Sequence, residues 1–77
     1  MQTKFKRHQK VKLLRAPLEE DIEPYADPPV EIKAGMTGKI NVLLPNGQYH
    51  VEIIDEKTGE TLAYAAMDEE GLEEIVE

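Results

Sequence analysis

Residues 34–55 read AGMTGKINVLLPNGQYHVEIID, and they carry the clearest strand pattern in the chain. Apolar and polar residues alternate on both sides of the pair Asn46-Gly47. Alternation with a period of two is typical of strands with one buried face, and Asn-Gly is the favoured pair for a turn whose two central residues both have positive φ. The stretch therefore predicts a β-hairpin with strands over residues 38–44 and 48–55.

The alternation also assigns the faces of this hairpin. We expect the inner face to hold Ile40, Val42, Leu44, Tyr49, Val51 and Ile53, and the outer face Lys39, Asn41, Leu43, Gln48, His50 and Glu52. Ahead of the hairpin, Gly35 and Gly38 suit a turn that requires positive φ or a close approach of two backbones.

The chain before the hairpin begins with a short basic stretch and one strand pattern. Residues 1–8 are expected to form a flexible basic arm. In residues 9–16, QKVKLLRA, Val11 and Leu13 alternate as in a strand with one buried face. Leu14 breaks the alternation, so the strand is expected to bulge or end there.

The segment 17–31, PLEEDIEPYADPPVE, holds four of the five prolines and six acidic residues. Proline lacks the N–H that a β-ladder requires and moves its predecessor away from helical dihedrals. The segment therefore predicts a long loop, which Ile22, Tyr25 and Val30 attach to the rest of the domain.

The C-terminal third continues the meander. Residues 56–60 predict a second turn with Gly59 in the left-handed conformation, and residues 61–67 a third strand with Leu62 and Tyr64 on one face. Residues 68–77 predict a short helical turn capped by Asp68, followed by a brief last strand at residues 75–77.

A sheet of four or five short strands avoids exposed edge strands when it closes into a barrel. We therefore expect an all-β chain, with residues 9–77 forming one small SH3-like, five-stranded, partly open barrel with a long first loop and a short C-terminal helical turn. An open meander sheet is the alternative.

Charge is distributed unevenly along the 77 residues, whose net charge is −7. Six of the nine basic residues lie in the first fifteen positions, and all sixteen acids follow them. An acidic body repels nucleic acid and attracts basic partners.

Cysteine is absent, which excludes disulfides and favours a reducing compartment such as the cytoplasm. No apolar run approaches the ~20 residues of a membrane span.

Several short motifs resemble those of a small prokaryotic SH3-like barrel family of unknown function. They are KVKLLRAP, IKAGMTGKI, YHVEIIDEKTGETLAYAAM and DEEGLEEIV, and the resemblance covers residues 9–76. Ile53 stands where an aromatic residue is common in that family, and the proline-rich segment and the basic arm depart from its pattern. The resemblance implies a non-enzymatic barrel, often encoded beside a larger partner such as a toxin-like protein. AGMTGKI also resembles, more weakly, the KOW motif of ribosomal proteins and transcription elongation factors.

Catalysis is not expected from this composition. The chain has no serine and no cysteine, so a Ser-His-Asp or Cys-His arrangement cannot form. His50 and Glu52 share a predicted strand face and could in principle act as a base or bind a metal, but a solvated strand position is the simpler interpretation. No cofactor or metal site is predicted.

Three binding hypotheses follow. The first is a protein-interaction module that meets a larger, basic protein partner through Glu19, Glu20, Asp21, Glu23, Tyr25 and Asp27. The second is a nucleic-acid-associated, KOW-like domain that uses Lys4, Phe5, Lys6, Arg7 and Lys10, with Lys33 and Lys39 in support; a sequence pI of about 4.8 speaks against it. The third is an accessory subunit that docks on a larger complex. The chain is expected as a monomer or an edge-strand homodimer.

Overall fold

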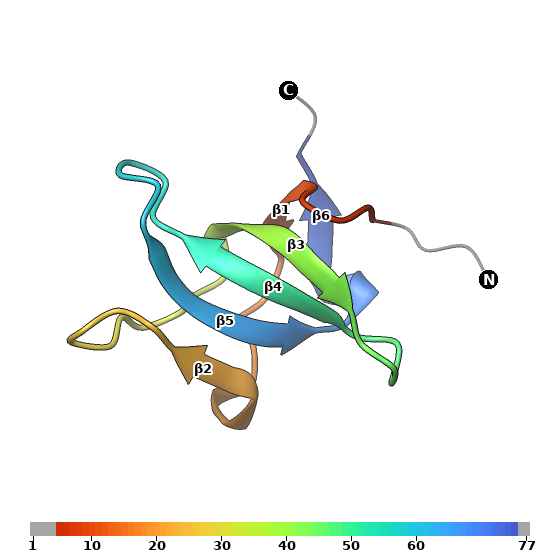
Figure 1. The fold of residues 1–77 in the computed structure, drawn as a ribbon, viewed down its shortest axis with the longest axis horizontal. Helices are drawn as coiled ribbons and strands as arrows, with labels where there is room; N and C mark the ends of the chain where they lie inside the picture. The colour runs from red at the N-terminus through yellow and green to blue at the C-terminus, as the bar shows by residue number, and fades with distance from the viewer. Residues whose placement is uncertain (1–4, 76–77) are drawn as a thin grey trace.

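The computed structural model describes residues 5–75, which form an all-β chain with one six-stranded antiparallel sheet. The strands are β1 (Lys10–Leu13), β2 (Ile22–Pro24), β3 (Thr37–Leu43), β4 (Tyr49–Ile54), β5 (Thr61–Met67) and β6 (Leu72–Glu74), with 3-10 turns η1 (Glu19–Asp21) and η2 (Glu69–Gly71). The order across the sheet is β2-β5-β4-β3-β1-β6 (Figure 1). No backbone pairing joins β2 to β6 among the described residues, so the sheet is not closed.

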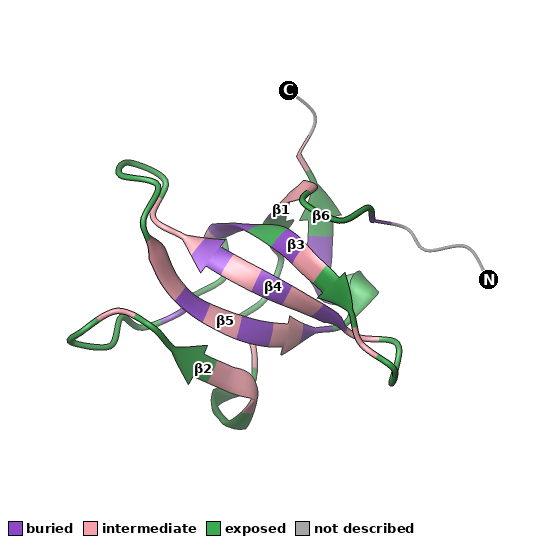
Figure 2. Cartoon of the chain, viewed as in Figure 1, coloured by how far each residue is buried: buried purple, intermediate pink, exposed green. Residues whose placement is uncertain are grey.

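The centre of the sheet follows the predicted alternation. Every second residue of β4 is buried, namely Tyr49, Val51 and Ile53, and the stripes continue onto β5 (Figure 2). On β5 the buried positions are Ala63, Ala65 and Met67, opposite Ile53, Val51 and Tyr49 respectively. The small Ala63 and Ala65 therefore face the larger Ile53 and Val51, which fills this part of the narrow interior without overlap.

The buried core also takes residues from outside these two strands: Phe5, Val11, Leu13, Ile32, Ile40 and Leu72. Phe5 corrects the expectation of a loose arm at this position. It is 2% exposed, its ring meets that of Tyr49 edge to face at 5.3 Å, and its N–H donates to the Tyr49 hydroxyl at 3.3 Å. Residues 1–4 lie outside the described residues.

The hairpin turn differs in type from the prediction. The N–H of Leu44 donates to the Gln48 carbonyl at 2.7 Å and that of Gly47 to the Leu44 carbonyl at 3.0 Å. Gly47 has a φ of 89°, but Asn46 is not in the positive-φ region. The loop therefore has three residues and ends on a left-handed glycine, a common hairpin form built on a type I turn.

One position in β3 shifts the predicted faces. Ile40 pairs with Val51 and Val42 with His50, so Asn41 is the extra residue of a β-bulge. Because a bulge moves the following residues to the opposite face, Val42 is 45% exposed. Its predicted inner position is wrong.

The expected long loop contains a strand. β2 pairs with β5 through Ile22, Glu23 and Pro24, which gives the sheet six strands where five were expected. An edge strand tolerates proline because one of its sides needs no partner, so the proline content did not exclude pairing here.

Gly35 and Gly38 at the start of β3 and the C-terminal turn lie where the sequence predicted them, but Asp68 does not cap that turn. Gly35 has a φ of 92°, and a Cβ on Gly38 would lie 2.6 Å from the Glu52 carbonyl oxygen. Asp68 makes no side-chain cap to η2. Its carboxylate instead pairs with Arg15 at 2.9 Å and accepts from Gln48 at 3.1 Å. β6 begins at residue 72, three residues before the expected last strand, whose residues 76 and 77 are not described.

Candidate functional site: a groove beside the edge strand

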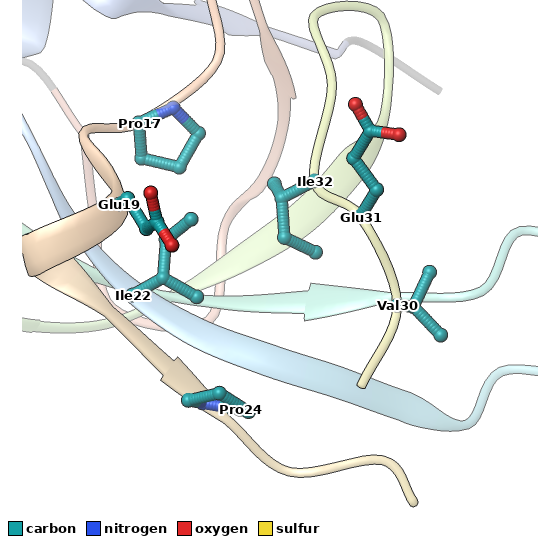
Figure 3. Close-up of a pocket in the computed structure, with 7 residues that line it drawn as sticks. All are labelled: Pro17, Glu19, Ile22, Pro24, Val30, Glu31 and Ile32. Atoms are coloured by element: carbon teal, nitrogen blue, oxygen red, sulfur yellow. The ribbon is translucent and has the colours of Figure 1, made fainter. Parts of the chain in front are cut away.

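A hollow of about 540 Å³ lies between β2 and the segment that returns toward β3. Figure 3 shows Ile22 of β2 and Ile32 of the returning segment on opposite sides of it. The lining residues are Pro17, Glu19, Ile22, Pro24, Val30, Glu31 and Ile32. We call this hollow the β2 groove.

Local structure brings these side chains together. Ile22 and Pro24 are two residues apart on one strand, so they project from the same face. The 3-10 turn before β2 places Glu19 next to them. On the far side Ile32 is buried in the core and holds its segment in place, while Val30 stays 42% exposed.

The lining of the groove offers hydrogen-bond acceptors and apolar surface but no side-chain donors. Five of the seven side chains are apolar and the other two are carboxylates, so none of them donates a hydrogen bond. Glu31 has Lys33 at 3.8 Å in an exposed pair, which contributes little in solvent. Among the described residues no basic side chain pairs with Glu19. A ligand must therefore bring its own donors together with apolar surface.

The free edge of β2 points to the same conclusion. Tyr25 N–H donates to the Leu62 carbonyl on β5. Hydrogen-bonded and non-hydrogen-bonded positions alternate in an antiparallel ladder, so the backbone groups of Ile22 and Pro24 are directed away from β5. Proline has no N–H, and the Ile22 N–H already donates to the Glu19 carbonyl. This edge offers acceptors without donors, which disfavours strand addition.

The six residues predicted to bind a protein partner do not share one face. Only Glu19 lines the groove. Glu20 lies with Leu18 at the exposed side of η1, and Asp21 belongs to a smaller hollow beside Arg15. Glu23 stands opposite Tyr64 on β5, on the outer face of the sheet. Asp27 is exposed in the loop after β2, where its peptide bond to Pro28 is cis.

Tyr25 lies with Glu23 on the outer face of the sheet. It is 66% exposed, and its ring meets that of Tyr64 in an edge-to-face arrangement with centroids 6.0 Å apart. The Tyr64 ring stacks on His50 at 5.3 Å. Partial burial raises the pKa of the Tyr64 phenol above its ordinary value of 10.0, and the carboxylate of Glu52 raises it further.

His50 and Glu52 are both engaged locally. The Asn41 side-chain amide donates to Nδ1 of His50 at 2.9 Å, and the Thr61 hydroxyl donates to Oε2 of Glu52 at 2.7 Å. Within residues 5–75 no three side chains of the metal-binding types His, Cys, Asp and Glu cluster closely enough to hold a metal ion.

The residues proposed for nucleic acid are also separated. Lys4 is not described, and the Phe5 ring is buried, so it cannot stack on a base. Lys6 and Arg7 are exposed. Lys10 lies opposite Lys39 on the neighbouring strand.

Sequence reasoning assigned no role to three groove residues, namely Pro17, Pro24 and Ile32. A signal was present, because Ile22 and Ile32 flank an otherwise polar, proline-rich stretch. Apolar residues at both ends of such a stretch indicate that each end is anchored and that a space is left between them.

Comparisons with known proteins give no relative for this chain: no family model, no curated protein and no solved structure matches it. No helix among residues 5–75 has the length and apolar character that crossing a bilayer requires. The resemblance to a small prokaryotic barrel family stays a prediction.

Proposed function

We propose that this chain is a non-enzymatic protein-interaction module, built as a partly open SH3-like barrel, that binds a basic segment of a larger protein through the β2 groove and the acidic residues around it. The single observation that carries the proposal is the groove lining, which has apolar walls, two carboxylates and no side-chain donor. A toxin-like neighbour or a subunit of a larger complex would both meet this description.

Charge supports the choice of a basic partner. Residues 17–31 carry six acids and no base. Such a concentration of one sign accelerates encounter with an oppositely charged partner and weakens as salt rises. The apolar walls then supply contacts that persist at high salt, because apolar burial is not screened by salt.

A matched pair of charge variants tests this proposal. The first variant neutralises four acids near the groove: Glu19→Gln, Glu20→Gln, Asp21→Asn and Glu23→Gln. The control neutralises four exposed acids elsewhere: Glu56→Gln, Glu60→Gln, Glu69→Gln and Glu70→Gln. Both change the net charge equally, so only a local site distinguishes them.

The probe is a fluorescently labelled hexalysine peptide, and the measurement is anisotropy at low salt. We expect the first variant to bind about tenfold more weakly than the unmodified chain and the control to change far less. Equal losses in the two variants, or no binding to the unmodified chain, would contradict the proposal.

A nucleic-acid role rests on a different observation, the adjacency of Lys10 and Lys39. The double variant Lys10→Glu/Lys39→Glu, set against Arg15→Glu/Lys57→Glu at exposed bases that this alternative does not use, separates it from the first. Loss of binding to a single-stranded oligonucleotide in the first pair alone would favour it.

A further inference from the structure

We propose that the β2 groove binds a lysine or arginine side chain of the partner along its methylene stem, with the cationic head at the carboxylate of Glu19. This inference rests on the proposed function and names the group that enters the site. It requires more than an acidic surface, because the length of the stem then contributes to affinity.

The shape of the lining leads to this occupant. Ile22 and Ile32 lie on opposite sides of the hollow and Val30 lies at one end (Figure 3). A purely ionic ligand would leave these walls in contact with water, and a purely aliphatic one would remove water from Glu19 without replacing its hydrogen bonds. A long basic side chain satisfies both demands, since its stem is apolar and its head carries only donors.

The positions of the two carboxylates give the bound side chain a direction. In Figure 3 the Glu19 carboxylate lies beside Ile22, whereas that of Glu31 extends away from the centre of the groove. Glu19 has no basic partner among the described residues, and Glu31 has Lys33 nearby. The head of the bound side chain is therefore placed at Glu19, with the stem running toward Val30 and Ile32.

The volume is larger than one side chain needs. About 540 Å³ leaves room for part of a neighbouring residue, so the occupant is a peptide segment and not a free diamine or amino acid. Tyr25 follows β2 directly and is 66% exposed, so its ring is accessible for a cation–π contact with a second basic residue.

The test varies the stem while the charge stays constant. Three labelled hexapeptides are compared with the full chain at pH 6: hexalysine, hexaornithine and a hexamer of 2,4-diaminobutyrate, whose side chains have successively one methylene fewer. Burial of a methylene predicts about a fourfold loss of affinity at each step, and so about fifteenfold across the series.

Two valines of similar exposure provide matched variants. Val30 is 42% and Val42 is 45% exposed. Val30→Thr keeps the shape but adds a hydroxyl to the groove, so it should weaken hexalysine binding and flatten the dependence on stem length. Val42→Thr, on the outer face of β3, should leave both unchanged.

A methyl-resolved NMR titration of the unmodified chain gives a readout that needs no variant. Hexalysine should shift the methyl signals of Ile22, Val30 and Ile32 but not that of Val42. Equal affinity for the three peptides, with binding retained, would overturn this inference and leave the acidic-surface function standing. No binding to any of them would overturn the function as well.

Discussion

The strands β3–β5 and the acidic segment 17–32 are built on opposite principles. The first is a continuous meander in which β4 pairs over its whole length on both sides and contributes three buried side chains. The second is anchored at few points, chiefly the three-residue β2 and buried Ile32. The meander carries the core, and the segment carries the exposed apolar and acidic groups available to a ligand.

Because the core and the exposed groups lie in different regions, stability and binding can be changed independently. Stability of a chain this small depends on a thin core, so substitutions in the meander should act on folding. Substitutions in the segment should act mainly on recognition.

Hydrogen exchange should show the largest contrast. The amides of Val51 and Ile53 lie in the central strand and should open only on global unfolding, whereas those of Asp27, Val30 and Glu31, which donate to no backbone carbonyl among the described residues, should exchange close to the rate of an unstructured peptide. Native-state exchange followed by NMR measures both. Comparable protection in the two regions would contradict the proposed difference in local stability between the meander and the segment.

Core truncation should give the next largest effect. Ile53→Ala removes a fully buried side chain and should cost about 3 kcal/mol of unfolding free energy. Val30→Ala in the segment should cost less than about 1 kcal/mol. Urea denaturation measures both, and similar losses would mean that the segment belongs to the core.

Two glycines separate steric from conformational cost. A Cβ at Gly38 would meet the Glu52 carbonyl oxygen and the Val51 side chain, so Gly38→Ala should cost about 2 kcal/mol. Gly35, whose φ is 92°, faces open space, and Gly35→Ala should cost about 1 kcal/mol from the left-handed backbone alone. Thermal unfolding of the two variants compares them, and a reversed order would contradict the tight approach of β3 to β4.

The smallest effect concerns Tyr64, where the two regions meet through Tyr25. Folding raises the pKa of Tyr64, so the neutral phenol is the form that the fold favours. The sign follows: stability is unaffected below the unfolded pKa of about 10 and falls as pH rises through the folded value. Tyr64→Phe should lack this loss. Unfolding free energies of both proteins between pH 8 and 11 test it, and parallel curves would contradict it.

Sequence patterns predicted the inner face of β4, the left-handed turn residue Gly59 and the C-terminal end of β1 before Leu14, since each depends on neighbours within a few residues. They failed at Val42, because a single extra residue in β3 reverses the faces that follow. They also failed for the candidate site, whose walls come from residues 17–24 and 30–32 and meet only after β2 has paired with β5.

By itself the sequence determined an all-β chain with a central meander, an acidic body and no apparatus for Ser- or Cys-based catalysis. Tertiary structure alone decided that Phe5 enters the core, that a proline-rich stretch supplies the sixth strand, and that Ile22 and Ile32 line one groove. The difference lies in how far apart along the sequence the interacting residues are. Alternation and turn chemistry act between adjacent residues, whereas edge pairing and burial depend on which distant segment arrives to remove a side chain from water.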